Sequence, residues 1–238
     1  MEELPTLASA FKAAGPRPPL DSSQGDKKNY AERLSRSLST VLANGLRPWF
    51  EGITPDPDGT RQEQPARTSK GVKKLDVNYS KPEIGLGLGV SIKTLNYRDP
   101  RSKRYTKNYS RIDNELRAEA KDYHERQPYS VLVAVIFLPV EACDDGSKSS
   151  ESSFGAAVQY YRHRTGRRIP RNEAELFERV FIGLYDHDGV VVFFDVAKPP
   201  PRTGRPKPSS MLFLQQLLEE VVKTYDARNN PPVEWVSE

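Results

Sequence analysis

Residues able to carry out phosphoryl chemistry are concentrated between Leu75 and Glu119. Asp76 lies in a short extended segment, and Lys93 ends an apolar run. Cleaving a phosphodiester requires neutralised phosphoryl oxygens and an activated water, and Mg²⁺ held by carboxylates can supply both. Mg²⁺ needs only one or two protein carboxylates because it keeps several waters, and a neighbouring lysine can offset developing charge. The pattern predicts a metal-dependent site with Asp76 as a ligand and Lys93 assisting.

Two predicted strands would bring these residues together. Residues 75–79 form a short strand candidate, and residues 84–95 form a second one with apolar side chains at alternate positions. Alternation places Ser91 and Lys93 on the opposite face from those apolar side chains. The backbone carbonyl of Ile92 would be a neutral oxygen ligand.

A run of spaced glycines occupies the first half of the second predicted strand. We expect them on the same face as Ser91 and Lys93, where they leave room for close approach to the backbone. The run continues into a strand rather than into a helix, which excludes a dinucleotide-binding fingerprint. The glycines are Gly85, Gly87 and Gly89.

A helix predicted over residues 108–125 would supply further acids. Its apolar positions recur at helical spacing, and a polar stripe runs beside them. Either Glu115 or Glu119 in that stripe could complete the site, although Glu115 could instead pair with Arg111 four residues earlier. The polar stripe consists of Asn108, Arg111, Glu115 and Glu119.

Leu75-Asp76-Val77 and Ser91-Ile92-Lys93, followed by this helix, resemble the PD-(D/E)xK nuclease superfamily over about residues 28–138. The resemblance implies a restriction-endonuclease-like core in which Asp76 is the metal-binding acid. Ser91 stands where the second acid of the motif is expected. In a subgroup of restriction endonucleases with this serine, the following helix supplies the missing carboxylate, which implies that role for Glu115 or Glu119.

The first predicted helix, over residues 28–46, contributes one more candidate. Glu32 matches the glutamate that many members of the superfamily carry on their first helix. Its alternative interpretation is an i,i+4 ion pair with Arg36.

The function implied by the resemblance is a Mg²⁺-dependent DNA endonuclease of the bacterial restriction or phage-defence type, with Mn²⁺ able to substitute. Double-stranded DNA would be the substrate, and a homodimer or higher oligomer is expected, together with partner proteins of a defence system. Two alternatives stay open. Ser91 favours a non-catalytic DNA-binding or assembly subunit that keeps the nuclease fold, and a repair or recombination nuclease acting on ends or structures is the other.

Charge is distributed unevenly. Residues 93–111 carry +6 and residues 162–171 carry +5, so the rest of the chain must carry −7 to give the overall +4. Basic faces of this kind attract polyanions, and nucleic acid is the first candidate. The predicted phosphate or base contacts are Arg98, Arg101, Lys103, Arg104, Tyr105, Lys107, Asn108, Arg111, Arg162, Arg164, Arg167 and Arg168.

The order of predicted elements indicates a mixed α/β fold with a central mixed β-sheet flanked by helices. We expect a flexible arm over residues 1–27 and one domain over 28–238, with its core at 28–138 and a C-terminal extension at 154–238. Residues 54–70 read as a mobile loop. The extension should contain helices at 154–163 and 173–179, a hairpin with strands at 180–185 and 190–196, and a last helix capped by Ser209 or Ser210.

Several classes of protein are excluded. The longest apolar run, residues 131–138, is too short to span a membrane, so no membrane partner is expected. The single cysteine, Cys143, excludes internal disulfides and a cysteine zinc site, and three scattered histidines make a histidine metal centre unexpected. The N-terminus lacks a signal sequence, so we expect a cytoplasmic protein.

Overall fold

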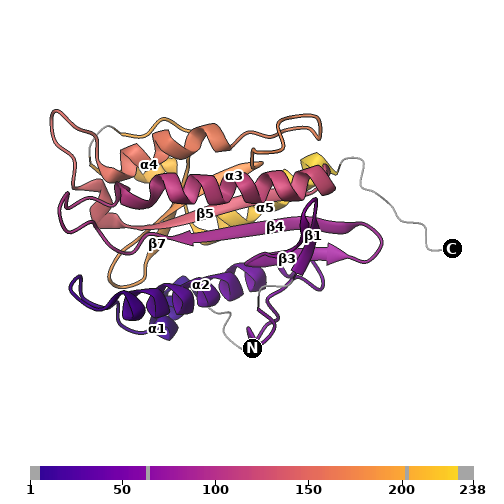
Figure 1. The fold of residues 1–238 in the computed structure, drawn as a ribbon, viewed down its shortest axis with the longest axis horizontal. Coiled ribbons are helices and arrows are strands. Elements are labelled where there is room, and N and C mark those ends of the chain that lie inside the picture. Colours follow the sequence, from indigo (N-terminus) through magenta and orange to yellow (C-terminus); the bar gives the residue numbers. More distant parts are fainter. Residues whose placement is uncertain (1–5, 63–64, 202–203, 230–238) are drawn as a thin grey trace.

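A six-stranded mixed β-sheet forms the centre of the computed structural model, which describes residues 6–62, 65–201 and 204–229 (Figure 1). The strands follow one another across the sheet in chain order. β4, β5 and β6 are parallel, and the other neighbours pair antiparallel. The strands are β3 (Val77–Lys81), β4 (Gly85–Thr94), β5 (Val131–Pro139), β6 (Arg179–Tyr185), β7 (Val191–Asp195) and β8 (Met211–Leu212). The mixed α/β prediction is confirmed.

Helices cover both faces of the sheet (Figure 1). One hydrophobic core lies beneath α1 (Leu7–Ala14), α2 (Gln24–Leu46) and α5 (Leu214–Arg228), and a second lies beneath α3 (Tyr109–Arg126) and α4 (Ser153–Tyr161). β5 is buried along its whole length, as expected for a near-continuous apolar strand covered on both faces. Parallel strands need long crossovers, and α3 provides the one between β4 and β5.

Short 3-10 helices and a small hairpin complete the secondary structure. The hairpin consists of β1 (Pro65–Thr68) and β2 (Gly71–Lys74). β1 lies within residues 54–70, which were predicted as a mobile loop, and β2 follows that segment. The 3-10 helices are Thr106–Asn108, Val140–Cys143, Arg162–Arg164 and Pro208–Ser210. No helix within the described ranges has both the length and the apolar character to cross a membrane.

A bulge in the β3–β4 pair corrects the prediction for the glycines. Tyr79 pairs with Leu88 while Ser80 pairs with Leu86, so Gly87 is the extra residue. A Cβ on Gly87 would lie 3.1 Å from the ring of Tyr79 on the α2 side of the sheet. Gly89 instead faces Leu75 and Leu132 on the α3 side. The expectation that the three glycines share one face is therefore wrong, because the bulge reverses the alternation.

The prediction of a flexible N-terminal arm is wrong for residues 7–14. Thr6 caps α1 by accepting a hydrogen bond from the Ser9 N–H at 3.2 Å. Leu7, Ala10 and Ala14 are buried in the core beneath α2, and their spacing places all three on one face of the helix. The small alanine side chains allow α1 to lie close against its neighbours.

Two predicted features of the C-terminal half are also wrong. No helix forms at 173–179, because this segment pairs with residues 164–167. The N–H of Phe177 donates to the carbonyl of Arg164, and the N–H of Arg167 donates to the carbonyl of Phe177. The last helix begins at Leu214 with Phe213 as its N-cap, so the predicted serine cap lies in the preceding 3-10 helix.

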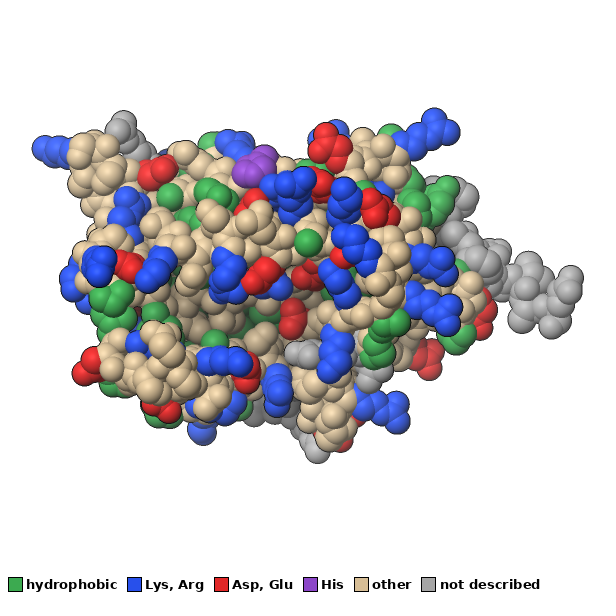
Figure 2. All heavy atoms as spheres, in the orientation of Figure 1, with side chains coloured by type: hydrophobic (Ala, Val, Ile, Leu, Met, Phe, Trp, Pro, Cys, Tyr) green, Lys and Arg blue, Asp and Glu red, His purple; other side chains and the backbone are tan. Residues whose placement is uncertain are grey.

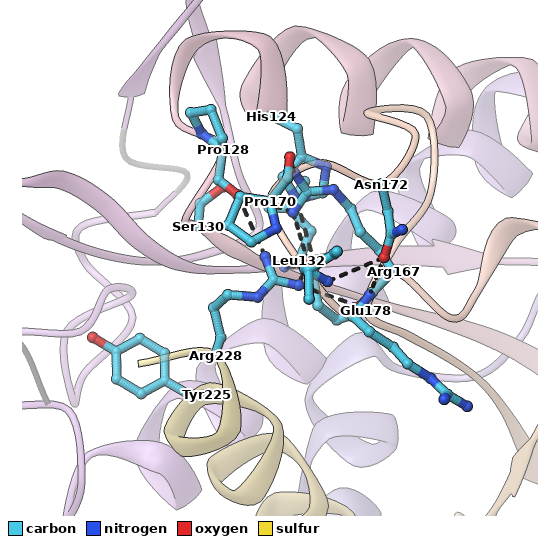
Figure 3. Close-up of polar contacts among 12 residues, drawn as sticks. His124, Pro128, Ser130, Leu132, Arg167, Pro170, Asn172, Glu178, Tyr225 and Arg228 are labelled. Atoms are coloured by element: carbon cyan, nitrogen blue, oxygen red, sulfur yellow. Dashed lines mark hydrogen bonds and ion pairs between the residues drawn. The ribbon is translucent and has the colours of Figure 1, made fainter. Parts of the chain in front are cut away.

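A buried ionic cluster joins the ends of several elements (Figure 3). Glu178 Oε1 accepts hydrogen bonds from Arg167 Nη1 at 3.0 Å and from Arg228 Nη2, at the end of α5, at 2.7 Å. Its Oε2 accepts from the Leu132 N–H at 2.7 Å and lies 3.4 Å from His124 Nε2, near the end of α3. Burial alone would raise the pKa of Glu178, but the nearby His124, the hydrogen bond from the Leu132 N–H and the charge of Arg228 outweigh it, so the pKa is lowered.

Candidate active site

Lys93 lies at the centre of a group of carboxylates on the α3 side of β4. Its Nζ is 3.4 Å from Glu119 Oε2 and 4.0 Å from Glu115 Oε2. Burial alone would lower the pKa of Lys93, but the charges of Glu119, Asp76 and Glu115 outweigh it and raise the pKa. Lys93 is therefore a fixed cation, suited to offset negative charge and unsuited to act as a neutral base.

Asp76 is held against β4 by the backbone. It immediately precedes β3, and its Oδ2 accepts a hydrogen bond from the Ile92 N–H at 2.7 Å. A charged acceptor makes such a bond short and strong. This contact continues the β3–β4 pairing through a side chain and places Asp76 beside the strand that carries Lys93.

Ser91 holds an acid supplied by the helix. Its hydroxyl is buried and donates a hydrogen bond to Glu119 Oε2 at 3.1 Å, the same oxygen that Lys93 approaches. Glu115 is more exposed, and its Oε1 accepts a hydrogen bond from Arg111 Nη1 at 2.5 Å. The predicted alternative pairing of Glu115 with Arg111 is confirmed. Glu119 is consequently the acid of α3 that is fixed against β4.

A cavity of about 480 Å³ opens between α2, β4 and α3, and Asp76, Lys93 and Glu115 line it. Glu32 of α2 lines it as well, and its ion pair is with Lys28 at 3.7 Å rather than with Arg36. Figure 2 shows this side of the molecule, with Lys and Arg side chains above and below a hollowed band and Asp and Glu side chains within it. Ser91 and Glu119 are not part of the cavity lining.

Sequence reasoning missed several residues of the cavity. α2 contributes more than Glu32, because its polar side chains at helical spacing form a stripe along one face. That periodicity was the available signal, but nothing in the sequence shows which face of α2 turns toward β4. The missed lining residues are Lys28, Ser35, Arg36, Ser39 and Gln62.

The donor set agrees with the needs of Mg²⁺. Among the described residues, no group of three or more His, Cys, Asp or Glu side chains is arranged to hold a metal ion. Mg²⁺ does not require such a group, since it is commonly held by one or two carboxylates with water completing the octahedron. Three carboxylates act on Lys93, and Arg111 binds one of them, Glu115. Asp76 and Glu119 are thus the two candidate ligands, with the carbonyl of Ile92 as a third.

Part of the first basic cluster forms an ordered, exposed loop. Asp99 accepts hydrogen bonds from the N–H groups of Arg101 and Ser102, each at 2.9 Å, and pairs with Lys107 at 3.1 Å. The N–H of Ser102 and the ammonium of Lys107 are the main causes that lower the pKa of Asp99 to about 2. Predicted contact residues that remain exposed are Arg98, Arg101, Lys103, Lys107, Asn108, Arg111, Arg162 and Arg168.

Two predicted nucleic-acid contacts are wrong because their side chains are buried. Arg167 is 2% exposed and is occupied by Glu178 and by the backbone carbonyls of Pro128 and Pro170. Tyr105 is 7% exposed and packs in the core beneath α3.

Two more of these arginines are engaged within the protein. Arg164 makes a two-pronged contact with Asp113 at 2.6 and 2.8 Å, which raises its pKa. Arg104 donates to the backbone carbonyl of Glu151 at 2.6 Å. A run of cations in sequence therefore overstates the number of cations that face solvent.

No protein-family model matches the chain, and the searches of curated proteins and of solved structures found no significant match.

Proposed function

We propose that this protein is a Mg²⁺-dependent DNA endonuclease of the restriction or phage-defence type, with a restriction-endonuclease-like core. The observation that supports the proposal is that Asp76 and Lys93 line one cavity and that Glu119 contacts Lys93 there. These residues come from the segment before β3, from β4 and from α3, so the acid and lysine pattern of the sequence converges in space.

Each residue has a distinct task in the proposed reaction. Asp76 and Glu119 would hold the metal ion, and the hydrogen bonds from Ile92 and Ser91 fix where these carboxylates lie. Bound Mg²⁺ would supply charge neutralisation at the phosphate and a more acidic water. Lys93 would stabilise the negative charge that develops on the phosphoryl oxygens, because its raised pKa keeps it protonated.

The surroundings of the cavity suit a polyanionic substrate. Lys28 and Arg36 from α2 and Arg111 from α3 line the cavity on opposite sides of the acids. Cations in such positions would contact phosphates on both sides of a scissile bond and would make binding salt-dependent. Because one site cuts one strand, double-strand cleavage by this protein would use two protomers.

Incubation of supercoiled plasmid with Mg²⁺, Mn²⁺ or EDTA tests the proposal. Wild-type protein should cut with either metal and not with EDTA. Asp76→Asn, which keeps an acceptor for the Ile92 N–H, and Lys93→Ala should each reduce cleavage by about a hundredfold or more. Lys81→Ala is the matched control, because Lys81 is an exposed cation at the far end of β3. Cleavage that survives both site variants would refute the assignment.

The alternatives give different results in the same experiment. A non-catalytic DNA-binding subunit would retard DNA in a gel in every buffer without cutting it in any. A repair or recombination nuclease would degrade linear DNA or branched structures while leaving supercoiled plasmid intact. Sedimentation of the protein with and without DNA tests the expected dimer.

A further inference from the structure

The β1–β2 hairpin is fastened to α3 by one buried carboxylate. The side chain of Asp122 is 2% exposed, and its Oδ1 lies 3.0 Å from Lys70 Nζ. Its Oδ2 forms a short ion pair with Lys73 Nζ. The hairpin turn adds a backbone contact, since the N–H of Ser69 donates to the carbonyl of Asp122 at 2.9 Å. A third contact joins the Ser69 hydroxyl to Glu125 Oε2 at 3.0 Å.

This carboxylate depends on the hairpin for its charge partners. Burial alone would raise the pKa of Asp122, but the hydrogen bond from Lys73 and the ion pair with Lys70 outweigh it, and the pKa is lowered. Both lysines belong to residues 69–74, so lifting the hairpin would break both ion pairs at once.

Asp122 is connected to both candidate metal ligands, to Glu119 along α3 and to Asp76 through the hairpin. It follows Glu119 by three residues on α3, which places it one turn away on the same side of the helix. The hairpin ends at Lys74, and the chain then runs through the buried side chain of Leu75 directly into Asp76. The ion pairs therefore tie the segment that carries Asp76 to the helix that carries Glu119.

We infer that Asp122 is a positioning residue, which clamps the hairpin onto α3 and thereby sets the place of Asp76 relative to Glu119. The role in metal binding rests on the proposed function, whereas the role in placing Asp76 does not. The clamp acts through Lys73 and Leu75, so Asp122 itself contacts neither metal nor substrate.

Amide hydrogen exchange of the full-length protein tests the clamp without reference to activity. The Ile92 amide is the reporter, because it donates to Asp76 Oδ2 and lies on β4 rather than on the hairpin. Asp122→Asn should accelerate exchange of this amide about tenfold, together with the hairpin amides. Lys73→Met, which opens the same contact from its more exposed side, should act in the same direction with a smaller effect.

A matched control is available on the same helix. Arg117 of α3 makes a two-pronged ion pair at 2.7 and 3.0 Å with Glu175, which is not a hairpin residue and has no direct contact with Asp122. Glu175→Gln removes one carboxylate charge from a contact of α3, as Asp122→Asn does, and should leave exchange at Ile92 unchanged. Faster exchange in the hairpin with an unchanged Ile92 amide in both Asp122→Asn and Lys73→Met would overturn the inference.

Calorimetric titration with Mn²⁺, without DNA, adds the functional measurement. Loss of a residue that orients a metal ligand commonly weakens metal affinity about 10- to 100-fold, so Asp122→Asn should fall near the lower end of that range. Unchanged Mn²⁺ affinity in this variant would overturn the metal-binding part of the inference. If the wild-type protein binds no Mn²⁺, the proposed function fails, and exchange at Ile92 still decides whether the clamp places Asp76.

Discussion

The buried cluster around Glu178 allows a stability prediction that is independent of any activity. Replacing Glu178 with Gln keeps the shape of the side chain and removes its charge. The two carboxylate oxygens accept hydrogen bonds from three donors, on Arg167, Arg228 and Leu132, and His124 Nε2 lies 3.4 Å from one of them (Figure 3). Glutamine offers one acceptor oxygen, and its amide nitrogen would face donors on the other side.

The expected loss follows from the burial of the partners. Side-chain exposure is 1% for Arg167, 3% for Arg228 and 2% for Glu178, so both guanidinium groups would keep their charge without a carboxylate. Removing one partner of a buried ion pair costs about 3–5 kcal/mol. A domain of ordinary stability, about 5–15 kcal/mol, would lose a large share of its free energy of unfolding.

Equilibrium unfolding in urea at pH 7 measures this loss, with Glu175→Gln as the control for removing a charge from an exposed pair. The control should leave the unfolding midpoint unchanged. Because the pKa of Glu178 is lowered in the folded protein, its contribution exists above the unfolded pKa, about 4.3, and disappears as the pH falls through the folded value. The difference between wild type and Glu178→Gln should therefore shrink in acid. A loss below about 1 kcal/mol at pH 7 would refute the reasoning, since that is the range of exposed pairs.

Three further predictions concern the candidate active site. Glu119→Gln should abolish metal-dependent plasmid cleavage, whereas Glu115→Gln should reduce it far less, because Arg111 already binds Glu115. Equal losses of cleavage rate in the two variants would contradict the choice of Glu119. Ser91→Ala should slow single-turnover cleavage about tenfold, the equivalent of one hydrogen bond of about 1.4 kcal/mol to a charged group, and an unchanged rate would show that Ser91 does not hold Glu119. The pKa of Lys93 is raised above its ordinary 10.5, so the protonated side chain stabilises the folded protein until the pH rises through the folded pKa. Lys93 therefore stays protonated between pH 6 and 9, and the pH–rate profiles of wild type and Lys93→Arg should have the same shape over this range.

Patterns within one element were read from the sequence, because they depend on residues a few positions apart. The helix containing α3 was predicted over residues 108–125 from apolar periodicity, and it formed within one residue of the expected ends. Alternation along β4 predicted that Ser91 and Lys93 lie on one face, and in the structure both side chains contact Glu119. The same rule failed at Gly87, because a bulge is created by the pairing partner and not by the strand alone.

Burial and charge pairing were decided by residues distant in sequence. Arg167 belongs to a basic run and looked like a phosphate contact, yet it is neutralised by Glu178 and shares that carboxylate with Arg228, 61 residues further along. The segment 173–179 has helical character locally, but it forms a turn and then pairs through Phe177 with residues 164–167. Tertiary context overrides local propensity where such partners are present.

The sequence by itself determined the mixed α/β class and the set of acids from which a site could be built around Lys93, since both follow from local periodicity and residue type. Only the tertiary structure decided which acid of α3 faces β4. Glu115 and Glu119 lie one turn apart on the same stripe, and their difference arises from Arg111 on one side and Ser91 on the other. The hairpin clamp on Asp122 was invisible for the same reason, because a buried charge is recognised only when its distant partners are in place.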